Sequence, residues 1–288
     1  MSASAIESDY EVAYLGPEGS FAHLVAKQRY AGSSHKLVPL RSVDEVFEYL
    51  DQNENVKGIV PIENSSGGII YPTVDGIIDA WIDHACKLFI EEELSIDVKL
   101  ALMTKKGRKI ERIYSHFAPI DHCTPYIKAN FPKAEVVICT STPNAAKFAA
   151  DDENGAAIGT IDAAEIYGLN EILAQEIRNE IPNVTQFFLV GRDRSNSEDN
   201  KKTSLVITLP NHPGSLVDFL EPFANSKVNL TRIQSRPVVG YPNTYNFLIE
   251  LEGTEITSSV SSALQKAEKV SVRFHNVGSY PVLPRYQS

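Results

Sequence analysis

The sequence predicts an α/β protein of two similar units around a cleft, followed by a smaller domain with a ferredoxin-like chain order. Apolar strands alternate with amphipathic helices between residues 11 and 168, which is the rhythm of a largely parallel sheet. The chain then returns to an apolar strand at 187–190, and two units joined by a returning connection place a ligand cleft between them. Residues 203–276 read strand, helix, strand, strand, helix, strand, which is the ferredoxin-like order.

The first unit is expected to alternate strands and helices. Its helices have apolar residues three or four positions apart, and Ser20 supplies the hydroxyl that suits a helix N-cap. We predict strands at 11–15, 37–40, 58–62, 88–96 and 98–103, and helices at 20–30, 42–50 and 73–81.

The second unit repeats this pattern. Thr142 suits an N-cap and Pro143 the first helical position, while Gly168 ends the last helix of the unit. We predict strands at 110–116, 135–139, 155–159 and 171–177, and helices after residue 119, from residue 142 and at 162–167.

Composition changes mark the domain boundaries. We expect a flexible N-terminus at 1–9 and a cleft-bearing domain at 10–192, whose subdomains cover about 10–95 with 180–192 and about 96–179. A polar linker follows at 193–202, and the ferredoxin-like domain covers 203–284.

Charge and cysteine content limit the classes of function. The 288 residues carry a formal net charge of -10 and no Lys/Arg-rich run, which speaks against nucleic acid or an anionic membrane as partner. Cys86, Cys123 and Cys139 are far apart, which indicates neither a metal site nor a disulfide framework. No signal-peptide pattern and no long apolar run are present, so a soluble cytoplasmic protein is expected.

Four loops share one design, in which an apolar strand ends and small polar residues lead into a helix. They are 16–20, 63–68, 115–119 and 141–144. Helix N-termini offer unpaired N–H groups and a favourable dipole to carboxylates, so a small dicarboxylic acid is the expected ligand. Each loop alone also reads as simple helix capping. Together with Thr185, at the mouth of the returning strand, the four loops favour a site.

These loops carry the motifs of a known family. Residues 16–21 read Gly-Pro-Glu-Gly-Ser-Phe, 60–65 Val-Pro-Ile-Glu-Asn-Ser and 185–187 Thr-Gln-Phe, together with Ser141-Thr142, Ala145-Ala146 and Ala156-Ala157-Ile158. Their order resembles the prephenate dehydratase family. Residues 213–216, Pro-Gly-Ser-Leu, and 234–237, Gln-Ser-Arg-Pro, resemble the amino-acid-sensing ACT domain fused to that enzyme.

The resemblance implies two periplasmic-binding-protein-like subdomains around the cleft, prephenate as substrate, no cofactor or metal, and a homodimer or homotetramer. Together with the loops it gives a predicted site. The catalytic candidates are Thr185, His116 and Glu63. The substrate-binding candidates are Ser20, Asn64, Ser65, Ser115, Ser141, Thr142, Gln186 and Phe187. His116 also reads as a strand-end histidine bound to backbone, and Glu63 as a helix cap.

The sequence departs from the family pattern at three places. Gln186 stands where the family's Thr-Arg-Phe has arginine, Ser66 follows the Glu-Asn-Ser loop where the family usually has glutamate, and 116–121 read His-Phe-Ala-Pro-Ile-Asp instead of His-Pro-Gln-Ala-Leu. The last form resembles the divergent prephenate decarboxylases of secondary metabolism, which also lose that arginine. Our interpretation is therefore a non-aromatising prephenate decarboxylase. The alternatives are a prephenate dehydratase and an inactive small-acid sensor.

The replacement of the family's arginine by the neutral Gln186 would explain how decarboxylation could occur without loss of the hydroxyl. The resemblance implies that Thr185 protonates the leaving hydroxyl of the substrate. In the family's dehydratases, the arginine at the position of Gln186 would fix the substrate by a charge-assisted pair. A substrate shifted by about 1 Å loses that proton transfer, so carbon dioxide leaves and the hydroxyl stays. Whether prephenate or its amino form arogenate is bound is open at this stage.

The C-terminal motifs predict an effector pocket between ACT domains. Its candidate residues are Pro213, Gly214, Ser215, Leu216, Gln234, Ser235, Arg236 and Pro237. The family has glutamate at the position of Gln234, so the loss of that carboxylate weakens the case for phenylalanine as effector. A purely dimerising ACT domain is the alternative.

Overall fold

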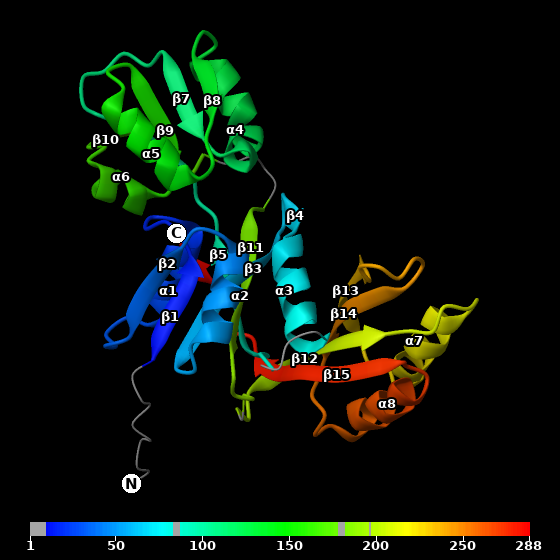
Figure 1. The fold of residues 1–288 in the computed structure, drawn as a ribbon. Coiled ribbons are helices and arrows are strands. Elements are labelled where there is room, and N and C mark those ends of the chain that lie inside the picture. The colour runs from blue at the N-terminus through cyan, green and yellow to red at the C-terminus, as the bar shows by residue number, and fades with distance from the viewer. Residues whose placement is uncertain (1–9, 83–86, 178–181, 196) are drawn as a thin grey trace.

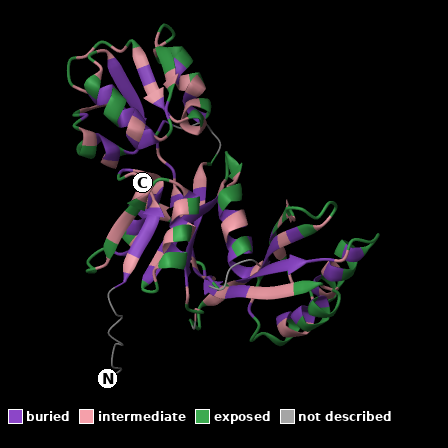
Figure 2. Cartoon of the chain, in the orientation of Figure 1, coloured by how far each residue is buried: buried purple, intermediate pink, exposed green. Residues whose placement is uncertain are grey.

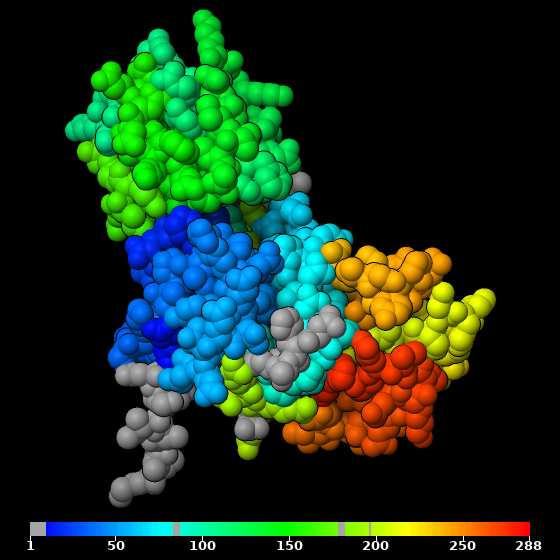
Figure 3. Space-filling model, in the orientation of Figure 1, coloured from blue at the N-terminus to red at the C-terminus, as the bar shows by residue number. Residues whose placement is uncertain are grey.

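The computed structural model describes residues 10–82, 87–177, 182–195 and 197–288, in three α/β bodies (Figure 1). The predicted flexible N-terminus at 1–9 and Cys86 lie outside the described residues. The first subdomain is followed by the second, which the chain enters and leaves through two neighbouring crossings, and the ACT domain comes last. Figure 3 shows the second subdomain and the ACT domain as separate lobes on the first.

The first subdomain is built on a sheet with the strand order β16-β5-β11-β3-β1-β2, to which β4 adds by pairing with β3. β1, β2 and β3 are parallel, whereas β11 is antiparallel to both of its neighbours. The elements are β1 (Glu11–Leu15), α1 (Phe21–Arg29), β2 (Lys36–Leu40), α2 (Val43–Gln52), β3 (Val56–Asn64), β4 (Gly68–Ile69), α3 (Tyr71–Ile82), β5 (Phe89–Asp97), β11 (Val184–Gly191) and β16 (Tyr286–Gln287).

The second subdomain is a smaller sheet with the order β10-β6-β9-β7-β8. Its helices pack through alanines such as Ala145 and Ala149, which lets α5 lie close to β9. The elements are β6 (Ala101–Thr104), β7 (Arg112–Ser115), α4 (Phe117–Asn130), β8 (Glu135–Ile138), α5 (Thr142–Asp151), β9 (Gly155–Gly159), α6 (Ile161–Tyr167) and β10 (Glu171–Ala174).

Two extended crossings join the subdomains. They hydrogen bond to each other where the Val98 N–H donates to the Asn183 carbonyl at 2.7 Å. On one side the subdomains also touch, since the Thr160 hydroxyl donates to the Gly19 carbonyl at 2.8 Å and Lys27 pairs with Asp162 at 3.0 Å. The predicted arrangement of two periplasmic-binding-protein-like subdomains is confirmed by this topology.

The C-terminal domain has the predicted ferredoxin-like order, with an antiparallel sheet β13-β14-β12-β15. Its own core lies between this sheet and its two helices. The elements are β12 (Asn200–Thr208), α7 (Ser215–Asn225), β13 (Leu230–Pro237), β14 (Tyr245–Glu252), α8 (Ser258–Lys269) and β15 (Arg273–Pro281). β12 begins at Asn200, so the last three residues of the predicted linker 193–202 belong to this strand.

The open face of the ACT sheet packs on the first subdomain. Val206, Leu248 and Val277 join the same buried cluster as Phe188 and Trp81. Most of β12 is coloured as buried in Figure 2. At Gly278 the two backbones meet, because a Cβ there would lie 2.3 Å from the Ile90 carbonyl oxygen of β5. After β15 the chain returns along β5, so the predicted end of the ACT domain at 284 falls inside this returning segment.

Helix boundaries follow local capping. The Ser42 hydroxyl accepts a hydrogen bond from the Glu45 N–H, as an N-cap of α2 should. The prediction that Thr142 is the N-cap of α5 is wrong. The Ser141 hydroxyl accepts a hydrogen bond from the Asn144 N–H, so Ser141 is the N-cap and Thr142 is the first residue of the helix. Among the described helices none is long and apolar enough to cross a membrane.

A methyl group at residue 278 should separate the ACT sheet from β5. We expect Gly278→Ala to lower the free energy of unfolding by about 1 to 3 kcal/mol more than Gly240→Ala does, because only residue 278 meets backbone. Both glycines have positive φ, so the strain of an L-residue is present in both variants. Chemical denaturation measures the difference, and equal losses would show that the approach to β5 is not restrictive.

Candidate active site

A cavity of about 890 Å³ lies between the two subdomains. Its walls come from the loop before α1, the turn after β3, the first turns of α4 and α5, and the start of β11. Eight of the predicted site residues line it: Ser20, Asn64, Ser65, His116, Ser141, Thr142, Thr185 and Phe187. The four loops and the returning strand, far apart in sequence, therefore meet at one place.

Thr185 and Asn64 form the polar centre of the cavity. They are opposite each other on β11 and β3, and the Asn64 Nδ2 donates to the Thr185 Oγ1 at 2.9 Å. The orientation of the Asn64 amide is fixed, because its Oδ1 accepts from the N–H groups of Ser66 and Gly67 at 2.9 and 2.7 Å. Since Oγ1 accepts this bond, the hydroxyl hydrogen of the buried Thr185 remains to be donated into the cavity.

The turn after β3 is tied to the start of β11 by a second set of bonds. Ser65 takes part with backbone and side chain: its N–H donates to the Val184 carbonyl at 2.8 Å, and its hydroxyl accepts from the Val184 N–H at 2.9 Å. Asn183 also enters this contact, accepting from the Asn64 Nδ2 at 2.8 Å. The Asn64–Thr185 pair is therefore held from both strands.

Helices α1, α4 and α5 direct their N-termini toward the cavity. Ser20 and Ser141 cap α1 and α5, whereas the N-cap residue of α4, His116, makes no side-chain cap bond. Helix N-termini attract carboxylates through N–H groups and the helix dipole. Among the described residues that line the cavity none is lysine or arginine, so an anion here meets dipoles and hydroxyls.

His116 lies at the wall of the cavity with its ring 4.4 Å from that of Phe117, centroid to centroid. Burial lowers the pKa of His116 below its ordinary value of 6.5, because desolvation disfavours the imidazolium. The lowered pKa favours the neutral ring near pH 7, in which one nitrogen can donate and the other can accept a hydrogen bond.

Three predicted site residues lie outside the cavity. Ser115 is fully buried and donates to the Ile158 carbonyl at 2.7 Å, so it joins two strands of the second sheet. Glu63 and Gln186 are paired on β3 and β11, one position from Asn64 and Thr185, and their side chains lie on the opposite face of the sheet. The prediction that Gln186 contacts the substrate is corrected by this position. Gln186 lies on the face opposite Thr185 because successive side chains of a strand point to opposite faces of the sheet.

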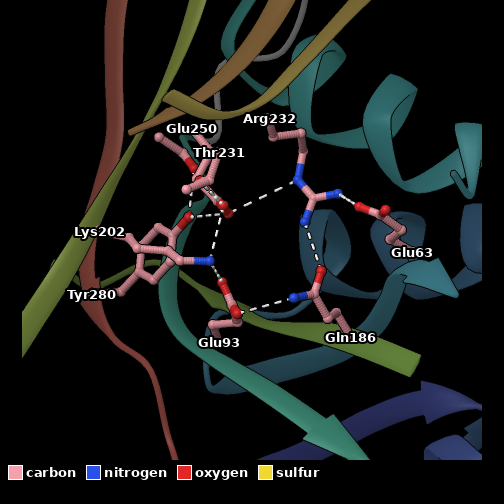
Figure 4. Close-up of polar contacts among 9 residues, drawn as sticks. Glu63, Glu93, Gln186, Lys202, Thr231, Arg232, Glu250 and Tyr280 are labelled. Atoms are coloured by element: carbon pink, nitrogen blue, oxygen red, sulfur yellow. Dashed lines mark hydrogen bonds and ion pairs between the residues drawn. The ribbon is translucent and has the colours of Figure 1, made fainter. Parts of the chain in front are cut away.

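Glu63 and Gln186 instead meet the ACT domain in a cluster of charged and polar residues, here called the interface cluster (Figure 4). Arg232 donates to Glu63 and, at 2.9 Å, to the Gln186 Oε1. The members of the interface cluster are Glu63, Glu93, Gln186, Lys202, Thr231, Arg232, Glu250 and Tyr280. Burial would raise the pKa of Glu250, but Lys202 and Arg232 hold it below its ordinary value.

Sequence reasoning missed several residues of the cavity and of this cluster. Asn183 precedes Thr185 by two positions, so the period of the strand could have placed it on the cavity side. Asp121, Thr124 and Thr140 also line the cavity, on α4 and before α5. The sequence did not indicate the role of Arg232, because its partners Glu63 and Gln186 belong to another domain and no motif or spacing links them to it.

The predicted effector residues lie at one end of the ACT sheet. Thr208, Asn246 and Arg236 form one row across β12, β14 and β13, which brings residues 234–237 beside the loop that leads to 213–216. Arg236 is engaged by the first subdomain, where its guanidinium pairs with Asp75 of α3 at 2.5 and 2.8 Å. β13, which carries the second motif, is the edge strand of the sheet.

Comparisons with known proteins agree with this architecture. The family description "Prephenate dehydratase" matches residues 12–195, which is more than half of the chain. The chain belongs to the prephenate dehydratase family. A second description, "ACT domain", matches residues 203–269, and the predicted family with a C-terminal ACT domain is thereby confirmed.

Relatives of the prephenate dehydratase family match over nearly the whole chain. The bifunctional chorismate mutase/prephenate dehydratase of Stutzerimonas stutzeri is 34% identical over 97% of this chain and 75% of its own. The prephenate dehydratase of Lactococcus lactis subsp. cremoris is 33% identical over 94% of this chain and 98% of its own. The solved prephenate dehydratase of Arthrobacter aurescens, a complex with L-Phe, is 30% identical, with a TM-score of 0.85 over 94% of this chain and 90% of that one.

The environment of His116 has a direct consequence for its titration. We expect its imidazole to protonate with a midpoint below 6.5, since burial opposes the cation. Proton NMR of the ring Cε1–H across pH 5 to 8 measures the midpoint, and the resonance is assigned by its absence in His116→Gln. A midpoint above 6.5 would contradict the neutral ring at pH 7.

Proposed function

We propose that this protein is a prephenate dehydratase, converting prephenate to phenylpyruvate, carbon dioxide and water. The observation that carries the proposal is the Asn64–Thr185 pair, which leaves one hydroxyl hydrogen facing a cavity bordered by three helix N-termini. The relatives named above, which carry dehydratase names, support dehydration over the decarboxylase interpretation.

The geometry accounts for the reaction with atoms and charge in balance. The bond to the ring carboxylate breaks, its electrons move through the ring, and the hydroxyl on the opposite ring carbon leaves with one added proton. Thr185 donates that proton as the carbon–oxygen bond lengthens, and the Asn64 N–H stabilises the charge that develops on Oγ1. The solvent then returns a proton to Thr185, so that one proton is consumed for each prephenate dianion converted.

The residues that line the cavity favour loss of the ring carboxylate of prephenate as carbon dioxide. A cation paired to the ring carboxylate would hold it in the ground state, and no described lining residue is lysine or arginine. Phe21, Ile120 and Phe187 supply apolar surface, which favours dispersal of charge as carbon dioxide forms. The side-chain carboxylate, which stays, is assigned to the N-terminal turns of α4 and α5.

A non-aromatising decarboxylase remains the second candidate. It is favoured by one observation: two of the departures from the family pattern, Ser66 with Gly67 and residues 116–121, do line the cavity. The third departure, Gln186, lies on the other face of the sheet and gives it no support.

We propose an amino acid as effector of the ACT domain. The support is the gathering of residues 213–216 and 234–237 at one end of the sheet, and the L-Phe complex of the Arthrobacter aurescens relative. The homodimer or homotetramer stays a prediction.

Proton NMR of prephenate incubated with the protein tests the main proposal. We expect aromatic protons of phenylpyruvate, and a kcat reduced about 10²- to 10⁴-fold in Thr185→Ala, because the proton donor is lost. Thr185→Ser keeps the hydroxyl and should retain most activity. Asn64→Asp keeps the acceptor for Ser66 and Gly67 but turns the Thr185 hydrogen toward the new carboxylate, so its kcat should also fall.

The other outcomes of this measurement point to the alternatives. Ring vinyl protons that persist with the carbinol proton would establish the decarboxylase and overturn the dehydratase. No turnover above the spontaneous reaction would favour the sensing module.

The position of Gln186 makes a separate prediction. We expect Gln186→Arg to give the same product as the wild type, because residue 186 faces away from the cavity. The kcat should fall, because the new guanidinium replaces the Oε1 that accepts the hydrogen bond from Arg232, but the identity of the product should not change. Product analysis by NMR checks this, and a change of product would place residue 186 in control of the reaction.

A further inference from the structure

Arg232 is an ACT residue whose side chain contacts both β3 and β11 of the first subdomain. Its side chain is 4% exposed, and it binds Glu63 and Gln186 from one side and faces Glu250, 3.8 Å from its Nε, on the other (Figure 4). Its guanidinium carbon also lies 5.9 Å from the centroid of the Phe188 ring. A buried guanidinium with partners in two domains has little freedom to move independently of either.

Glu63 and Gln186 form one rung of the β3–β11 ladder, and Asn64 and Thr185 form the next. The ladder shifts register directly after Gln186, so this rung borders a β-bulge. A bulge removes regular pairing and leaves local strand geometry more dependent on side-chain contacts. Arg232 holds both members of the bordering rung, one on each strand.

The geometry points to Arg232 as a positioning residue for the Asn64–Thr185 pair. By binding Glu63 and Gln186 together, it fixes the separation of β3 and β11 one residue from the hydrogen bond that orients the Thr185 hydroxyl. The inference rests on the proposed function of Thr185 as proton donor. It assigns the ACT domain a structural part in the catalytic site itself.

Arg232 is anchored on its own domain, which makes this link stiff. β13 has a bulge of its own between Leu230 and Arg232, and this turns the Arg232 side chain to the face opposite the ACT core. Glu250, beside Arg232, is held by Lys202 at 3.0 Å, by Tyr280 at 3.0 Å and by Thr231. A displacement of β13 therefore moves Arg232 with it, and the rung on β3 and β11 follows.

A general adhesive role for Arg232 is the competing explanation, and the same strand offers a matched comparison. Arg236 of β13 pairs with Asp75 across the same domain interface, at 2.5 and 2.8 Å. Asp75 lies on α3 and not on the β3–β11 ladder. Asp75→Asn thus weakens an interdomain ion pair without touching the rung beside Thr185.

Steady-state kinetics on prephenate with four variants tests the inference. In Gln186→Met, which keeps the side chain's length but loses its hydrogen bond to Arg232, we expect kcat to fall about tenfold with KM within about twofold, as for a small misplacement of a catalytic group. Glu63→Gln should act in the same direction. The double variant should lose less than the product of the single losses, since both act through Arg232, and Asp75→Asn should keep the wild-type kcat.

A second readout does not depend on turnover. In protein with ¹³C-labelled threonine methyl groups, assigned by Thr185→Ser, the Thr185 methyl resonance should shift in Gln186→Met and stay in place in Asp75→Asn. Absence of turnover by the wild type would refute the proposed function, while the methyl shift would still report the positioning. The inference is overturned if Gln186→Met matches the wild type in kcat and methyl shift, or if Asp75→Asn reduces kcat equally.

Discussion

The antiparallel pairing of β11 with β3 is the constraint on which the rest of the structure depends. It sets Thr185 opposite Asn64 on one face of the sheet and Gln186 opposite Glu63 on the other. Because side chains alternate along a strand, a shift by one residue would exchange the two faces. The pairing of β3 with β11 therefore determines both the cavity and the contact to the ACT domain. A change of register would alter both together.

The interface that results is mixed in character. Apolar contacts around Phe188 and Val206 bring the ACT sheet onto the first subdomain. The interface cluster adds charged groups, of which Glu93, Arg232 and Glu250 are buried. Desolvation offsets much of the attraction within such clusters, whereas removal of one partner leaves a buried charge and is costly. The cluster therefore restricts how the two domains meet more than it strengthens their association.

Most of the fold could be predicted from local patterns, because strand and helix periods, caps and chain order are properties of neighbouring residues. The cavity residues of the four loops, such as Ser20 and Ser141, followed from the same patterns. Gln186 was misplaced because motif adjacency to Thr185 was taken as spatial adjacency, although consecutive strand residues face opposite ways. The partnership with Arg232 depends on domain packing, which no local pattern encodes.

The return of the chain after β15 gives the ACT domain two covalent attachments to the first subdomain. Residues 282–287 run along β5 and supply the strand that completes the end of its sheet. Severing the polypeptide before β12 would remove this strand as well, and the exposed N–H and carbonyl groups of β5 would become a template for pairing with other chains. The segment after β15 therefore protects the edge of β5, and a chain shortened before β12 should aggregate more readily than the full chain.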